Sequence, residues 1–185
     1  MNRVGPSAAI LCRSLLALLA VSLLGGASPP TSKQYRTFIR GNMQARGPIQ
    51  PNGEARFVSL LIGQPNKPLE REAPFFIKLG SGLAMEPADF KVDRIAGLAG
   101  MQKLVLEKSE WGRGAVEYSV EGMVFVFQGE HCVAFRANWV QLPNKIFAPE
   151  IGSAQSSAFY KMPLSRAQLE LIFGPPDEIR DKTSL

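Results

Sequence analysis

Reactive side chains are scarce in this 185-residue sequence, which contains one histidine, His131, and two cysteines, Cys12 and Cys132. A structural zinc site takes four His, Cys or carboxylate ligands at short spacings, and the sequence has no cluster of that kind. It also has no P-loop, GxSxG or GxGxxG motif. We therefore expect no metal and no cofactor, and the common nucleophile motifs give no support to an enzyme.

His131 and Cys132 are neighbours inside an apolar run, EYSVEGMVFVFQGEHCVAFRANW. If this run forms strands, consecutive side chains point to opposite faces, so the thiol and the imidazole cannot readily form a nucleophile and base. We interpret Cys132 as a small core residue opposite Phe127, and His131 as a half-exposed residue beside a turn.

The sequence has a single long apolar run, and it lies near the amino terminus. Arg3 and Arg13 precede SLLALLAVSLLGGAS, the layout of a secretory signal with cleavage expected after Ala27. The run from residue 15 to 24 is about half the length of a membrane-spanning helix. We predict a signal peptide at residues 1–27 and an exported chain, periplasmic or extracellular, with no stable membrane span. An uncleaved anchor and a cytoplasmic chain are the alternatives.

Little else in the composition points to a particular partner. The net charge is +5, from 21 Lys+Arg and 16 Asp+Glu, and removal of residues 1–27 takes away two arginines and leaves +3. No basic run occurs, so we expect no nucleic-acid binding. The exported chain keeps Cys132 alone and cannot form an internal disulfide, so its stability must come from an apolar core.

Apolar periodicity predicts one α+β domain over residues 28–185, a mostly antiparallel meander sheet packed by two main helices. A helix is expected within residues 85–100, with Ala88, Val92, Ile95, Ala96 and Ala99 on one face. A second helix is expected from Ser165, capped by Gln168, to Gly174. The two helical regions are weakly similar. Either a half-repeat of 85–139 and 162–185 or two unrelated amphipathic helices that end in glycine would explain this similarity. Period-two segments predict strands at residues 33–46, 56–63, 74–80 and 103–139, and the segment 140–162 reads as a long connection.

The sharpest turn signal is Gly129 followed by Glu130, which fits a type II′ hairpin turn. This turn would pair Phe127 with Cys132, Val126 with Val133, Phe125 with Ala134 and Val124 with Phe135. Both faces of the hairpin would then be apolar, so we expect it to lie centrally and to be covered on each side.

A family resemblance rests on residues 95–97, Trp111, Tyr118 and Gly122, together with Phe125, Phe127, Val133 and the helix end at 169–176. This pattern resembles the small periplasmic module of SmpA/OmlA-type outer-membrane assembly lipoproteins. The resemblance implies an envelope protein that binds other proteins without catalysis. The lipid-bearing cysteine of that family has no counterpart here, and too few residues follow the second helix for another meander.

The function expected from the sequence is that of an exported cell-envelope binding or accessory protein without catalysis, whose partner is another envelope protein. One alternative is a small extracytoplasmic hydrolase that uses two of Glu107, Glu110, Glu117 and Glu121. Another is a secreted inhibitor or immunity-type protein. The candidate binding residues combine aromatic and arginine side chains, as interfaces often do: Trp111, Arg113, Tyr118, Arg136 and Trp139. The loop formed by Gly80, Ser81 and Gly82 is a candidate anion site.

Overall fold

Antiparallel strands make up most of the protein. The computed structural model describes residues 33–70, 73–80, 82–107 and 109–184, and this part is 50% strand and 11% helical. The predicted signal peptide at 1–27 lies outside the described residues.

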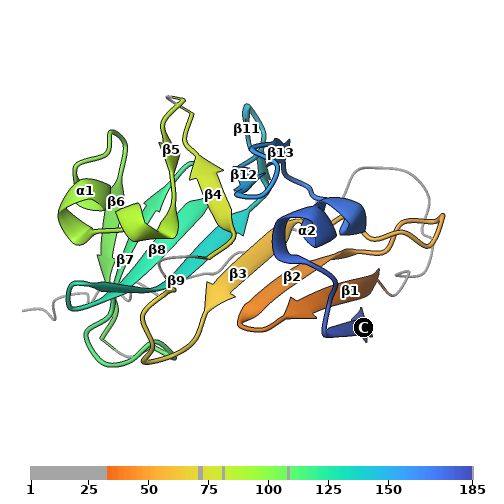
Figure 1. The fold of residues 1–185 in the computed structure, drawn as a ribbon, viewed down its shortest axis with the longest axis horizontal. Helices are drawn as coiled ribbons and strands as arrows, with labels where there is room; N and C mark the ends of the chain where they lie inside the picture. The colour runs from red at the N-terminus through yellow and green to blue at the C-terminus, as the bar shows by residue number, and fades with distance from the viewer. Residues whose placement is uncertain (1–32, 71–72, 81, 108, 185) are drawn as a thin grey trace, which may run out of the picture. The chain divides into compact units, whose positions relative to one another are not determined.

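The larger of two main sheets has eight strands in the order β14-β1-β2-β3-β9-β8-β7-β6, and every neighbouring pair is antiparallel. Their bounds are β1 Lys33–Arg40, β2 Met43–Pro48, β3 Ser59–Gly63, β6 Gln102–Val105, β7 Val116–Val120, β8 Met123–Gln128, β9 His131–Asn138 and β14 Glu178–Ser184. The predicted hairpin β8–β9 lies in the interior of this sheet, with β14 and β6 at the edges (Figure 1).

A second sheet of four antiparallel strands has the order β13-β12-β4-β5, and β10 and β11 form a separate two-stranded ribbon. Their bounds are β4 Phe75–Lys78, β5 Ala84–Met85, β10 Val140–Leu142, β11 Lys145–Phe147, β12 Glu150–Ser153 and β13 Phe159–Lys161. The segment 140–162, which reads as a connection, therefore contributes four strands.

The predicted α+β class with two main helices is wrong, because the chain is mostly β. The first expected helix is reduced to a 3-10 turn, η1 Pro87–Asp89, and a short helix, α1 Val92–Ala96. Of the predicted stripe only Ile95 is buried, whereas Ala88, Ala96 and Ala99 are exposed. Such small side chains bury too little apolar area to support a longer helix.

The second helix, α2 Arg166–Phe173, begins where the sequence predicts. Ser165 accepts a hydrogen bond from the Gln168 backbone N–H, and the Gln168 side chain accepts one from the Ser165 N–H. Gly174 ends the helix with φ +85°. In the part of the chain described here, no helix combines the length and the apolar character needed to cross a bilayer.

The hairpin turn is confirmed, but the register changes halfway along the strands. Gly129 has φ +61°, and Phe127 pairs with Cys132 as expected. A β-bulge then makes Val126 oppose Ala134, so that Phe125 faces Phe135. The extra residue is Val133, and the bulge returns Phe135 to the face that carries Phe125 and Phe127.

Aromatic rings join the two sheets into one core. Phe75 of β4 stacks on Phe135 of β9 with ring centroids 5.8 Å apart, and Phe90 lies 5.0 Å from Phe125. Leu169 and Ile172 of α2 belong to the same buried cluster. On the opposite face of the hairpin, Trp111 covers a smaller cluster made by Val126, Val133, Ala134 and Ala115. Both faces of the β8–β9 hairpin are thus buried.

Candidate functional site

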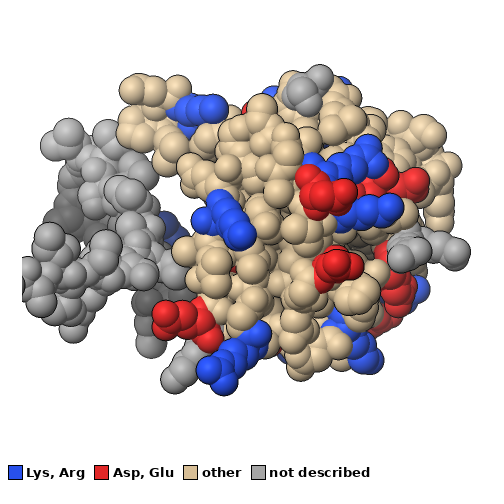
Figure 2. Space-filling model, turned by 90° about the vertical axis from the view of Figure 1, so that its left-hand side faces the viewer, with Lys and Arg blue, Asp and Glu red and all other residues tan. Residues whose placement is uncertain are grey.

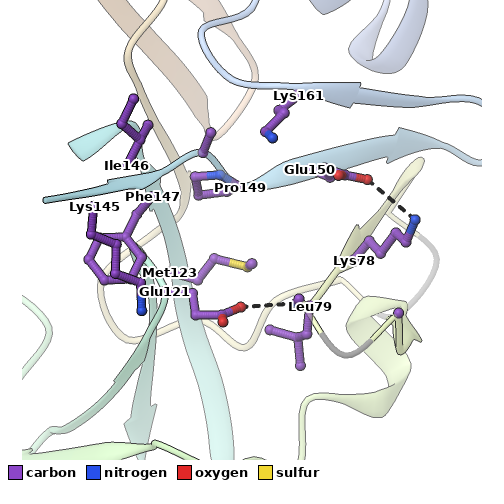
Figure 3. A pocket seen from close by; sticks show the side chains of 13 residues that line it. Lys78, Leu79, Glu121, Met123, Lys145, Ile146, Phe147, Pro149, Glu150 and Lys161 are labelled. Carbon is purple, nitrogen blue, oxygen red and sulfur yellow. Dashed lines mark hydrogen bonds and ion pairs between the residues drawn. The ribbon is translucent and has the colours of Figure 1, made fainter. Parts of the chain in front are cut away.

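A cleft of about 450 Å³ opens where the end of β4, the β7–β8 turn, β11 and β13 meet (Figure 3). We call it the lysine cleft, because Lys78, Lys145 and Lys161 come from three different strands to line it. Two acidic residues, Glu121 and Glu150, also line it. A cleft of this size is within the range of small-molecule sites.

Glu121 holds an unusual backbone conformation at the rim of the lysine cleft. It has φ +49° and is followed by Gly122 with φ +81°, so both central residues of the β7–β8 turn have positive φ. Turns of this kind favour Asn, Asp or Gly, because other side chains pay a steric cost. The Glu121 carboxylate accepts a hydrogen bond of 2.9 Å from the Gly80 backbone N–H. The residue with the strained backbone, Glu121, is thus also the one whose side chain binds the Gly80 N–H.

Gly80 is shaped to receive that carboxylate. A Cβ atom added at Gly80 would lie 2.7 and 2.8 Å from the two carboxylate oxygens of Glu121. The predicted anion site at Gly80, Ser81 and Gly82 therefore lies beside a carboxylate of the chain itself. Gly80 and Gly82 line the lysine cleft, and Ser81 lies outside the described residues.

The three lysines of the cleft differ in their partners. Lys78 Nζ is 3.6 Å from Glu150 Oε2 and 5.5 Å from the Phe159 ring centroid. Lys145 Nζ lies 4.5 Å from the Phe147 ring centroid, a cation–π contact. Neither Lys145 nor Lys161 has an acidic partner among the described residues. The cleft therefore holds two ammonium groups whose charge is not balanced by a paired carboxylate.

Apolar side chains form about half of the lining of the lysine cleft, and charged side chains form its rim. Leu79 and Met123 are 5% and 2% exposed, Pro149 is buried, and Phe147 is partly buried. The cleft thus combines an apolar lining with charged groups at the rim, and its two acidic side chains are both engaged with other groups of the chain.

The aromatic residues of the predicted binding set are not brought together on the surface. Trp111 is 4% exposed and covers the outer cluster, whereas Tyr118 is 6% exposed and packs edge-on against Phe127 in the main core. Trp139 is partly buried and packs against that core as well. Trp111 and Tyr118 therefore pack into different clusters, and neither is available as a surface anchor.

The two arginines of that set also occupy different places. Arg136 lies on β9 and forms an ion pair with Glu117 of β7, while its Nε is buried without a hydrogen-bond partner among the described residues. Arg113 is exposed and lines a hollow with Val105 and Glu107 beside strand β6.

The candidate carboxylates of a hydrolase lie in several different places in the structure. Glu117 pairs with Arg136, and Glu121 is bonded to Gly80 in the lysine cleft. Glu107 lines the hollow beside β6, and Glu110 is exposed. Among the residues that the structure describes, no group of three or more His, Cys, Asp or Glu side chains could hold a metal ion.

Cys132 is buried on the core face, and His131 is exposed at the turn. Burial, outweighing the pKa-lowering effect of backbone hydrogen bonds at Ala134 and Val126, raises the pKa of the Cys132 thiol to about 12. The thiolate is therefore rare at neutral pH, and the thiol has no access to solvent reagents.

We predict that Cys132 resists alkylation in the folded protein. With Cys12→Ser as background, iodoacetamide at pH 8 should label Cys132 at least about 100-fold more slowly in the native chain than in urea, because burial removes both access and thiolate. Mass spectrometry of timed samples measures the two rates. Equal rates in the folded and unfolded chain would contradict the buried placement.

Sequence reasoning missed the lysine cleft as a whole, because its residues come from four separate segments of the chain. One local signal was present: the turn Val120-Glu121-Gly122-Met123 has glutamate at a position that requires positive φ. A residue that fits its turn poorly indicates that its side chain has another role.

Fold and cleft together define a mostly antiparallel β protein with a lysine-lined cleft. No family model matches the sequence, and neither a curated protein nor a solved structure shows significant similarity to it. The resemblance to the SmpA/OmlA-type module is thus neither supported nor contradicted, and it stays a prediction.

Proposed function

We propose that this protein is an exported binding protein of the cell envelope, which acts through contact with another protein and not through catalysis. The exported location is inferred from the sequence of residues 1–27 alone. The contact we propose is the addition of an extended segment of the partner to the free edge of strand β6.

The observation that carries the proposal is the exposure of β6. Among the residues that the structure describes, this strand ends the eight-stranded sheet and pairs only with β7. All four of its residues are exposed, and the side chains of Leu104 and Val105 are 57% and 58% accessible. An exposed edge strand presents unpaired backbone N–H and C=O groups that can pair with another chain.

The opposite edge of the same sheet is built differently. Strand β14 has the sequence EIRDKTS, with Glu178, Arg180, Asp181 and Lys182 exposed. Charged side chains of this kind discourage the addition of another strand. Since one edge is protected by charge and the other carries exposed apolar residues, β6 is the edge that suits a partner.

Side chains near β6 can supply specificity. Leu104 and Val105 are consecutive, so they point to opposite faces of the sheet and would contact an added strand on both faces. Arg113 and Glu107 line the hollow next to Val105 and could receive a polar side chain of the partner. The side of the protein that carries β6 has dispersed charges of both signs on a largely uncharged surface (Figure 2), which fits a protein partner better than a polyanion.

The test is affinity capture from the envelope fraction with three chains: the natural sequence, Leu104→Lys/Val105→Lys, and Leu171→Lys. The double variant places two charges on the β6 edge, and we expect it to lose the captured partner. Leu171 is 54% exposed on α2, so Leu171→Lys is a matched control and should keep the partner. Hydrogen exchange of residues 102–105 should slow when the partner is bound.

Two results would contradict this proposal. One is equal capture by the natural chain and the double variant, with unchanged hydrogen exchange in β6. The other is capture of no stable partner together with turnover of a glycan or ester panel, which would favour the hydrolase alternative instead.

A further inference from the structure

We infer that the lysine cleft binds a small amphiphilic anion, in which a carboxylate or phosphate group is carried on a short apolar chain. This site is separate from strand β6 and would give the protein a small-molecule ligand in addition to its protein partner.

The charges of the cleft favour an anion. Three lysines and two glutamates line it, and both glutamates are already engaged: Glu150 with Lys78 and Glu121 with the Gly80 N–H. Lys145 and Lys161 are left without an acidic partner among the described residues. An isolated exposed lysine is usually only solvated, but here the two come from β11 and β13 to line one hollow (Figure 3).

The apolar lining favours a ligand with an apolar body. Ile146 is 59% exposed and Phe147 is partly buried, so both side chains offer apolar surface inside the cleft, and Phe147 holds the Lys145 ammonium over its ring. A ligand chain lying against Ile146 and Phe147 would remove apolar area from water, while its anionic group lay near Lys145 or Lys161.

The engagement of Glu121 with Gly80 keeps the acidic charge at one side of the cleft. The hydrogen bond ties this carboxylate to the β4 end, and the strained turn holds its backbone there. Glu121 would still repel a nearby anion, so removing its charge should tighten binding. A side chain that served the fold alone would not produce that gain.

The experiment titrates the full chain with decanoate and with decyl phosphate, using decanol and inorganic phosphate as comparison probes. Calorimetry gives the affinity, and the NMR signal of the Met123 methyl group reports on the cleft itself. We expect both amphiphilic anions to bind more tightly than decanol and than inorganic phosphate, and to shift the Met123 signal. Binding should weaken as salt rises.

Four variants separate charge from structure. Lys145→Gln/Lys161→Gln should weaken decanoate binding by about tenfold, because each ammonium contributes a charged contact at a partly exposed site. Glu121→Gln keeps an acceptor for Gly80 and should tighten binding about two- to threefold. Lys182→Gln, on β14, is the matched control and should change nothing, and Leu104→Lys/Val105→Lys should also bind decanoate normally.

Equal affinity for decanol and decanoate would overturn the inference, as would unchanged binding in the double lysine variant or weaker binding in Glu121→Gln. Failure here is distinguishable from failure of the proposed strand addition, because partner capture depends on β6 and decanoate binding depends on Lys145 and Lys161.

Discussion

Replacing Phe135 by alanine should lower the free energy of unfolding by about 3–5 kcal/mol, near the upper end of what one core truncation costs. The Phe135 side chain is fully buried, and its ring contacts those of Phe75, Phe90 and Phe125. These contacts join β9 to the four-stranded sheet, so the cavity left by the substitution would lie between the two sheets. Urea unfolding followed by tryptophan fluorescence measures the loss.

A matched control is Phe159→Ala, which removes the same side chain from a position that is 36% exposed. It should cost about 1 kcal/mol or less, because less apolar area returns to water. A similar loss in both variants would contradict the placement of Phe135 in the main core. A hairpin register without the bulge would instead put Phe135 on the opposite face of the sheet.

The β8–β9 hairpin shows how far local sequence information reaches. Gly129 predicts the turn, and the turn predicts the pairing of Phe127 with Cys132, which the structure confirms. The bulge at Val133 has no comparable local signal, since valine fits a regular strand as well as a bulge. It arises because Phe135 gains more by packing with Phe75 than it would on the face covered by Trp111.

Pairing between distant segments could not be predicted from period and turn signals. Strand β14 pairs with β1 along seven residue pairs, although the two segments lie at opposite ends of the described chain. Arg36 fixes this register through two hydrogen bonds of 2.8 Å to Asp181. The segment 140–162 forms strands because β12 finds a partner in β4, about 70 residues earlier. In such strands tertiary contacts outweigh a local composition typical of loops.

The lysine cleft illustrates the same limit at the level of function. Its residues have no motif, since a site assembled from separate turns and strand ends needs no fixed spacing in the sequence. The predicted aromatic set failed to assemble for a related reason: strand residues such as Tyr118 serve the core, and only the fold decides which face of a sheet is covered. Local signals existed for only two parts of the cleft: the glycine loop at Gly80 and Gly82, and the poor fit of Glu121 to its turn.

Gly47→Ala should destabilise the protein by at least about 3 kcal/mol, although it adds only one methyl group. A Cβ at Gly47 would lie 1.9 Å from the carbonyl oxygen of Arg56 and 2.6 Å from the Cα of Phe57. Both are backbone atoms, so no side-chain rotation relieves the clash. The Arg56–Phe57 backbone is held by hydrogen bonds to Pro48 and Leu164, and Phe57 is fully buried against Phe38.

Moving that backbone would therefore disturb β2, the start of α2 and the core at once. The control is Gly97→Ala, where a Cβ would lie 3.3 Å from its nearest neighbour, the Asp93 carbonyl oxygen, and where φ is −79°. Its effect should lie within about 0.5 kcal/mol of the natural chain. Thermal unfolding measures both variants. Insoluble expression of Gly47→Ala, with soluble expression of Gly97→Ala, would also support the prediction, because it indicates an even larger loss of stability. Equal melting temperatures would show that β2 and the Arg56–Phe57 backbone do not approach each other this closely.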